Sequence, residues 1–270
     1  MNSTCGYTVC GNGPCIVLLH SSMSSKNQWK PLISLMAPKF QLISIDLSGY
    51  GDNDLPMNHQ TFSTDDEICL VSGIIEKEIG NTEPFQLVAH SYGGAIALKM
   101  AAELPHRVAS LTLFEPVPFH LLHPDEPACI EITSIIDQLT RALKEENKRS
   151  ATQLFIDYWS EKGTFEKLKP VNKDALINYI DKVVLDFQAL INESLTLEDY
   201  SNINIPVCLI KGEKSPLSAV RLFRILAKTL PEPFLYSVPG GHMSPVTDFK
   251  TVNSIIEQFL TLPELSPVFG

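Results

Sequence analysis

The stretch of sequence that decides the fold runs from Phe85 to Met100 and reads FQLVAHSYGGAIALKM. Its first five residues form a short, mostly apolar run, as in a strand buried on both faces, and Pro84 prevents regular structure just before it. From Ala95 onward the residues are good helix formers. The chain must therefore turn sharply between a strand and a helix, and Ser91 lies at that turn.

Small residues surround this turn. A side chain larger than a methyl at Ala89, or any at Gly93 and Gly94, would collide with the neighbouring strand or helix, so the turn can be tight. A serine between a strand and a helix is the context of a nucleophile elbow, here with Ala89 in place of the first glycine of G-x-S-x-G. A serine that merely caps the helix explains the same residues, so this motif alone leaves both interpretations open.

Composition restricts the partners of the chain. Its 270 residues include 21 basic and 31 acidic side chains, a net charge of −10 that argues against nucleic acid and against anionic membranes. No apolar run approaches the ~20 residues that span a bilayer, and the N-terminus lacks a basic segment followed by an apolar core. We therefore expect a cytoplasmic protein.

The cysteines show no C-x-x-C spacing and lie mostly in apolar surroundings. This pattern is typical of free, buried thiols in a reducing compartment, and it argues against both a disulfide scaffold and a zinc site. The six are Cys5, Cys10, Cys15, Cys69, Cys129 and Cys208.

Strand and helix patterns alternate along most of the chain, which predicts an α/β fold with a mostly parallel sheet and helices on both faces. The expected strands cover residues 7–10, 15–20, 40–46, 85–89, 109–114, 207–211 and 234–238. The expected helices outside the region 117–204 cover residues 29–36, 64–79, 95–104, 217–230 and 252–260.

Residues 117–204 interrupt this alternation, because they contain only helical patterns, at 130–148, 151–159 and 173–191. Such a stretch is too long for a loop. Since it leaves and re-enters the sheet at strand ends, we expect a helical cap, inserted before the last two strands, over the carboxyl edge of the sheet. The expected division is core 1–116, cap 117–204 and core 205–270. A helical addition packed away from any site is the alternative.

A serine nucleophile needs a base, and His242 is the best placed of the seven histidines. It follows the last expected strand and the flexible pair Gly240 and Gly241. The others are expected to be structural (His20 beside the loop after the first buried strand, His90 at the turn), exposed (His59, His106), or either substrate contacts or solvated (His120, His123).

Four motifs, in this order and spacing, resemble the α/β-hydrolase superfamily over residues 7–260: LLHSS at 18–22, DLSGYG at 46–51, AHSYGG at 89–94 and GGH at 240–242. The resemblance implies a catalytic triad with Ser91 and His242, and an oxyanion hole formed by the backbone amides of Ser22 and Tyr92. His-Gly is frequent where this chain has His20 and Ser21, and the nearby serine hydroxyls either add a donor or brace the loop. A serine nucleophile differs from the aspartate of the dehalogenase and epoxide hydrolase members.

The triad acid has three possible assignments. The usual aspartate position of the superfamily is occupied by Ser215. Some branches place the acid after the strand beside the nucleophile strand, where this chain has Glu115, and strands ~4.8 Å apart bring that side chain within reach of the same imidazole. Pro116 favours an extended backbone at Glu115. We assign Glu115, with Glu213 second and no acid at all third.

These residues predict a serine hydrolase that cleaves a small, largely apolar carboxylic ester through an acyl-enzyme on Ser91, with no metal or organic cofactor. The aliphatic and aromatic residues of the cap suggest the apolar substrate. A thioesterase or a carbon-carbon bond hydrolase would use the same triad. A small-molecule receptor without turnover is the alternative from another class, because an aspartate is missing at Ser215.

Overall fold

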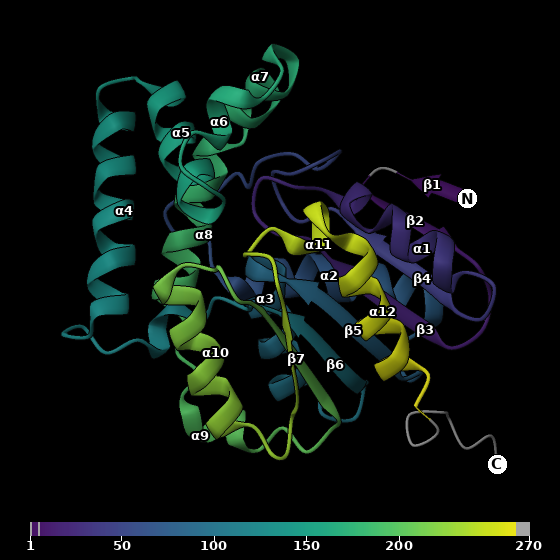
Figure 1. Cartoon of the computed structure of the whole chain (residues 1–270). Coiled ribbons are helices and arrows are strands. Elements are labelled where there is room, and N and C mark those ends of the chain that lie inside the picture. The colour runs from purple at the N-terminus through teal and green to yellow at the C-terminus, as the bar shows by residue number, and fades with distance from the viewer. Residues whose placement is uncertain (1, 5, 263–270) are drawn as a thin grey trace.

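The computed structural model describes residues 2–4 and 6–262, which form one eight-stranded sheet in the order β1-β2-β4-β3-β5-β6-β7-β8 (Figure 1). The strand β2 pairs antiparallel with β1 and β4, and every other pairing is parallel, so the predicted mostly parallel α/β fold is confirmed. The strands are β1 (Asn2–Thr4), β2 (Tyr7–Cys10), β3 (Cys15–Leu19), β4 (Gln41–Ile45), β5 (Phe85–His90), β6 (Val108–Phe114), β7 (Val207–Gly212) and β8 (Phe234–Val238).

The buried strands divide their side chains between two cores. Alternate residues of a strand face opposite sides of a sheet. In β3, Ile16 and Leu18 pack in a cluster with α1 and α12, whereas Val17 and Leu19 pack in the cluster on the other face, with α2, α3 and α10. These helices are α1 (Lys30–Met36), α2 (Thr64–Ile79), α3 (Ser91–Glu103), α10 (Leu217–Thr229) and α12 (Phe249–Leu260).

Between β6 and β7 the structure has helices and no strand. Figure 1 shows all but the last of these helices gathered on one side of the sheet, whereas the last, at residues 197–201, lies beside α10. We call residues 117–204 the inserted segment; its status as a separate cap domain, with the boundaries given above, stays a prediction. Its elements are the 3-10 helix η2 (Phe119–Leu121) and the helices α4 (Pro127–Lys144), α5 (Lys148–Trp159), α6 (Thr164–Lys167), α7 (Pro170–Asn178), α8 (Ile180–Ile191) and α9 (Leu197–Ser201).

Two predicted helices of the inserted segment were wrong in extent. The one expected over 130–148 ends at Lys144, and a turn with a positive φ at Glu146 precedes α5. The one expected over 173–191 is two helices that meet at Tyr179. The tyrosine hydroxyl accepts a hydrogen bond from the Gly51 amide at 3.2 Å, and its ring lies 5.2 Å from that of Tyr50, so contacts with the core anchor the break.

The turn at Ser91 is as tight as its small residues predict. Ser91 has a φ of 54°, in the left-handed region, and it is the first residue of α3, which starts four residues earlier than expected. His90 occupies the N-cap position, so Ser91 is not the helix cap. A methyl group on Gly93 would lie 2.4 Å from the carbonyl oxygen of His20, which explains why only glycine fits there.

His20 holds the loop after β3 against the loop after β4, which agrees with the structural role expected of it. Its Nε2 accepts a hydrogen bond from the Leu47 amide at 3.0 Å, and its Nδ1 lies 2.7 Å from the carbonyl oxygen of Ser21, to which it donates. The side chain is fully buried, and burial lowers the pKa of His20 to about 4. The ring therefore stays neutral. This agrees with the hydrogen bond from Leu47, because Nε2 can accept only when it carries no proton.

The cysteine prediction holds in one respect and fails in another. All five cysteines in the described part of the chain are free, and Cys5 lies outside the described residues. Of these five, however, only Cys15 and Cys208 are buried, and Cys69 is exposed because it lies on the outer side of α2. No helix within residues 2–4 and 6–262 is long and apolar enough to cross a membrane.

The space around Gly93 and Gly73 differs, so we expect opposite effects on stability when each is replaced by alanine. Gly93→Ala should lower the free energy of unfolding by about 1–3 kcal/mol, because its methyl would overlap backbone atoms of β3 and the following loop. Gly73→Ala, on the exposed side of α2 with open space around it, should raise that free energy by about 0.5–1 kcal/mol. Urea denaturation measures both; a Gly93→Ala variant as stable as the wild type would contradict the packing described.

The buried neutral His20 predicts acid sensitivity. The pKa is about 4 in the folded protein against an ordinary 6.5, so the unfolded chain binds the extra proton first and stability falls as the pH drops from 6.5 to 4. The His20 share of this loss is about 3 kcal/mol. His20→Gln keeps an acceptor for the Leu47 amide and cannot titrate, so its urea midpoint should fall less over this interval. Equal slopes for the two proteins would refute this explanation.

Candidate active site

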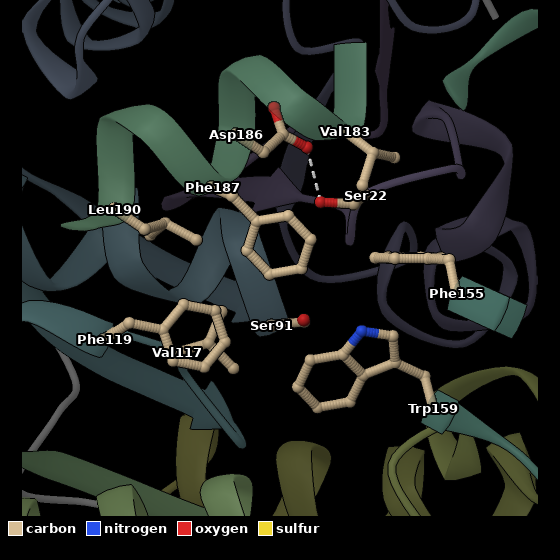
Figure 2. Close-up of a pocket in the computed structure, with 10 residues that line it drawn as sticks. All are labelled: Ser22, Ser91, Val117, Phe119, Phe155, Trp159, Val183, Asp186, Phe187 and Leu190. Atoms are coloured by element: carbon tan, nitrogen blue, oxygen red, sulfur yellow. Dashed lines mark hydrogen bonds between the residues drawn. The ribbon is translucent and has the colours of Figure 1, made fainter. Parts of the chain in front are cut away.

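The candidate nucleophile lies where β5 meets α3. The left-handed backbone of Ser91 costs about 1–3 kcal/mol, and such strain persists only where the surroundings enforce it. The side chain is nearly buried, yet it borders two cavities. Figure 2 shows its hydroxyl pointing into the smaller of them.

His242 lies in the loop between β8 and the short helix α11 (Ser244–Thr247). Its Nε2 is 2.9 Å from Ser91 Oγ, within hydrogen-bond distance. Its carbonyl oxygen accepts a hydrogen bond from His90 Nε2 at 2.9 Å, and the indole of Trp159 packs on its ring with the ring centres 4.1 Å apart. His90 therefore holds the loop that carries His242. The sequence analysis expected His90 to stabilise only the turn at Ser91.

Glu115 follows β6 directly and is fully buried. Its Oε2 lies 2.7 Å from His242 Nδ1, and its Oε1 accepts a hydrogen bond from the Gly212 amide at 2.7 Å. The extended backbone expected at Glu115 is wrong, because its φ is 42°. In this left-handed conformation the carboxylate is held between the last residue of β7 and the loop that follows β8.

The structure brings Glu115 to His242 and leaves the other candidate away from it. Glu213 is exposed, and its Oε1 accepts a weak hydrogen bond from Ser237 Oγ at 3.4 Å. At the usual acid position, Ser215 Oγ is buried and makes no hydrogen bond to a described residue. Glu115, directly after β6, thus occupies the position beside the His242 imidazole.

The two residues expected to form an oxyanion hole flank Ser91. Tyr92 is in the first turn of α3, where amides have no acceptor within the helix, and Ser22 lies in the loop after β3 and lines both cavities with Ser91. Ser22 Oγ donates a hydrogen bond of 2.5 Å to Asp186 Oδ2 of α8 (Figure 2). Of the two roles considered for the serine hydroxyl, this contact favours bracing the loop.

A buried charge cluster behind these residues was missed by the sequence analysis. Lys182 of α8 contacts carboxyl oxygens of both Glu67 and Asp186, and all three side chains are at most 2 % exposed. Burial alone would lower the pKa of Lys182, but the two carboxylates outweigh it and raise that pKa. Burial raises the pKa of Asp186. A signal was present, because Lys182 and Asp186 lie one helical turn apart in a helix whose other residues, apart from Asp181 and Gln188, are apolar.

Two cavities meet at Ser91. The larger, about 250 Å³, is mostly apolar and is bordered by Ser91 and His242, by α5, α6, α7 and α11, and by the loop after β3. The smaller, about 10 Å³, is lined mainly by apolar side chains from the loop after β6 and from η2, α5 and α8, with Ser22, Ser91 and Asp186 as its polar members (Figure 2). Phe155 and Trp159 of α5 border both cavities.

The remaining histidines lie outside this site. His59, His106 and His123 are exposed. His120 hydrogen-bonds the carbonyl oxygen of Leu190 at 3.3 Å and borders neither cavity. Within the described ranges, no cluster of three or more His, Cys, Asp or Glu side chains could hold a metal ion.

Comparisons with known proteins identify the family to which the chain belongs. The chain is 24 % identical over 276 residues to a putative 2-succinyl-6-hydroxy-2,4-cyclohexadiene-1-carboxylate synthase of Bacillus subtilis, covering 94 % of each chain. It is 25 % identical over 253 residues to a pimeloyl-[acyl-carrier protein] methyl ester esterase of Legionella pneumophila, covering 93 % of this chain and 96 % of that protein.

Among solved structures, the enol-lactonase of Burkholderia xenovorans LB400 superposes with a TM-score of 0.78 at 17 % identity, over 95 % of this chain and 96 % of that one, a likeness of fold alone. The family model for the alpha/beta hydrolase fold matches residues 14–249, which include every site residue described above. The chain therefore belongs to the α/β-hydrolase family.

Proposed function

We propose that this protein is a serine hydrolase that cleaves a small, largely apolar carboxylic ester through an acyl-enzyme on Ser91. One observation carries the proposal: an unbroken chain of hydrogen-bond distances from Ser91 Oγ through the His242 imidazole to the Glu115 carboxylate, beside an apolar cavity. The esterase name of the Legionella relative supports the same class of reaction.

The proposed acylation uses the two ring nitrogens of His242 in different ways. Nδ1 keeps its proton and donates a hydrogen bond to Glu115. Nε2 therefore carries no proton and can take the proton of Ser91 Oγ. The serine oxygen then attacks the ester carbonyl carbon. As the bond to the alcohol oxygen breaks, Nε2 returns the proton to the leaving alcohol. Glu115, paired with the imidazolium that forms between these steps, stabilises its charge.

Deacylation repeats these transfers with water. Water gives a proton to His242 Nε2 and attacks the acyl carbon, and the carboxylic acid leaves as the proton returns to Ser91 Oγ. In both tetrahedral intermediates the negative oxygen would be held by the backbone amides of Ser22 and Tyr92. Each such donor is worth about 3 kcal/mol in rate.

The two cavities suggest the size of the substrate. The larger one, about 250 Å³, suits an apolar acyl or alcohol group of a few carbons. The smaller one, about 10 Å³, has room for about one water molecule, so the group on the other side of the carbonyl must be small. Esters with one methyl-sized and one short apolar substituent fit this description best.

The first test of the proposal is turnover that depends on Ser91. Wild-type protein should hydrolyse p-nitrophenyl esters of short acids, with kcat/KM falling for long chains, and Ser91→Ala should abolish this activity. A fluorophosphonate probe should add its mass at Ser91 only. A folded protein that shows neither reaction would contradict the proposal, and tight ligand binding without turnover would favour the receptor alternative. Matched thioesters and vinylogous diketones distinguish the other bond types.

The second test identifies the acid. Glu115→Gln should lower kcat by up to ~10⁴-fold, because a neutral amide no longer stabilises the imidazolium or holds the correct tautomer. Glu213→Gln is the matched control, since Glu213 is exposed and contacts Ser237 instead, and its kcat should stay within about twofold of wild type. Circular dichroism checks that both variants fold. The reverse ranking of the two variants would refute the assignment of Glu115.

A further inference from the structure

We propose that Lys182 of α8 is a positioning residue that sets the spacing of the oxyanion hole. This inference rests on the proposed function, in which the amides of Ser22 and Tyr92 hold the oxyanion. Ser22 lies in the loop after β3 and Tyr92 in the first turn of α3. Their side chains are both linked to the ammonium group of Lys182, each through one carboxyl group.

The link to Tyr92 passes through Glu67 of α2. Glu67 Oε1 accepts hydrogen bonds from Lys182 Nζ at 3.0 Å and from Tyr92 Oη at 3.1 Å, and the ammonium lies 3.5 Å from the tyrosine oxygen itself. Burial raises the pKa of Tyr92 well above its usual range, so the hydroxyl keeps its proton and acts as a donor. Glu67 Oε2 also accepts from the amide and the hydroxyl of Ser48, both at 3.0 Å, which adds the loop after β4.

The link to Ser22 passes through Asp186. One carboxyl oxygen, Oδ1, contacts Lys182 Nζ, and the other, Oδ2, accepts hydrogen bonds of 2.5 Å from both Ser22 Oγ and Tyr50 Oη. Figure 2 shows Asp186 reaching down from α8 to Ser22 above the small cavity. The loop after β3 is therefore attached to the same ammonium group as the first turn of α3.

Stability alone gives no reason for this cluster. Two carboxyl groups and one ammonium lie in the core with Lys182 and Glu67 fully buried, and removing such groups from water costs several kcal/mol each. Apolar side chains of similar volume often pack as stably. What apolar packing cannot supply is directional contact with both Ser22 and Tyr92, since hydrogen bonds fix distance and angle.

The position of Lys182 links the hole to the inserted segment. Ser22, in the loop after β3, and Tyr92, in α3, lie outside the inserted segment, whereas Lys182 and Asp186 belong to α8. The spacing of the two amides would therefore be correct only while α8 is docked. A displacement of about 1 Å at a reacting centre can lower a rate by about 10²-fold.

Lys182→Met tests the proposal, and Lys99→Met is its matched control. Lys99 is the other buried lysine that ties the inserted segment to the core: its side chain is 6 % exposed and contacts Glu193 at 3.1 Å, but it touches none of the hole residues or their partners. Lys182→Met should lower kcat by about 10- to 100-fold with KM within about threefold of wild type. Lys99→Met should keep kcat within about threefold, although both variants lose thermal stability.

A transition-state analogue separates positioning from general damage. An alkyl trifluoromethyl ketone forms a tetrahedral adduct with a serine and places an oxyanion in the hole, so its Ki should rise in Lys182→Met by the same factor as kcat/KM falls. Binding of the matched methylene compound, which lacks the carbonyl, should not change. Equal losses of kcat in the two lysine variants, or equal weakening of both inhibitors, would overturn the proposal.

If Lys182→Met does not fold, two other variants replace it. The first is a triple variant without charges in the cluster: Glu67→Gln, Lys182→Met and Asp186→Asn. The second is the double variant Ser22→Ala and Tyr92→Phe. The double variant keeps both amides and cuts both links, so its kcat should also fall by about 10- to 100-fold. A double variant with wild-type kcat would refute the inference. Wild-type protein without Ser91-dependent turnover would refute the proposed function instead, which keeps the two failures distinct.

Discussion

The close contact between α3 and the end of β3 is the constraint on which the rest of the site depends. Because no side chain fits between Gly93 and the carbonyl of His20, the helix starts immediately after β5 and Ser91 takes a left-handed backbone. That conformation directs the serine hydroxyl away from the sheet, toward the loops that follow the neighbouring strands. The parallel arrangement of β3, β5, β6 and β7 then brings those loops to the same edge.

Local patterns were enough to predict β2 to β8, because each of these strands has its own apolar run or turn residues, but β1 was not predicted. The prediction also named Ser91, His242 and Glu115, and the structure places His242 within hydrogen-bond distance of both other residues. Long-range contacts account for the failures. The break at Tyr179 depends on the hydroxyl's contact with Gly51, and the left-handed backbone of Glu115 accompanies its bond to Gly212. No pattern within either segment encodes such partners.

The buried cluster of Lys182, Glu67 and Asp186 was not predicted, for a related reason. Sequence patterns indicate solvent for charged residues in a helix, and only the packed structure shows that Glu67 approaches from a helix 115 residues earlier in the chain. Buried charges of this kind are costly to stability, so their presence beside a candidate site points to function. The site is thus built from two sources: the sheet edge supplies the reacting groups, and α5 and α8 supply the walls and the charges behind them.

The packing of Trp159 on His242 has a consequence for observing this protein in solution. The chain has two tryptophans, and they lie in different surroundings: Trp159 stacks on the imidazole, whereas Trp29 is buried with α1 on the opposite side of the sheet. The emission of an indole depends on the groups that surround it. The molecule therefore contains one intrinsic fluorophore in contact with the imidazole beside Ser91, and a second in the opposite core that serves as an internal reference.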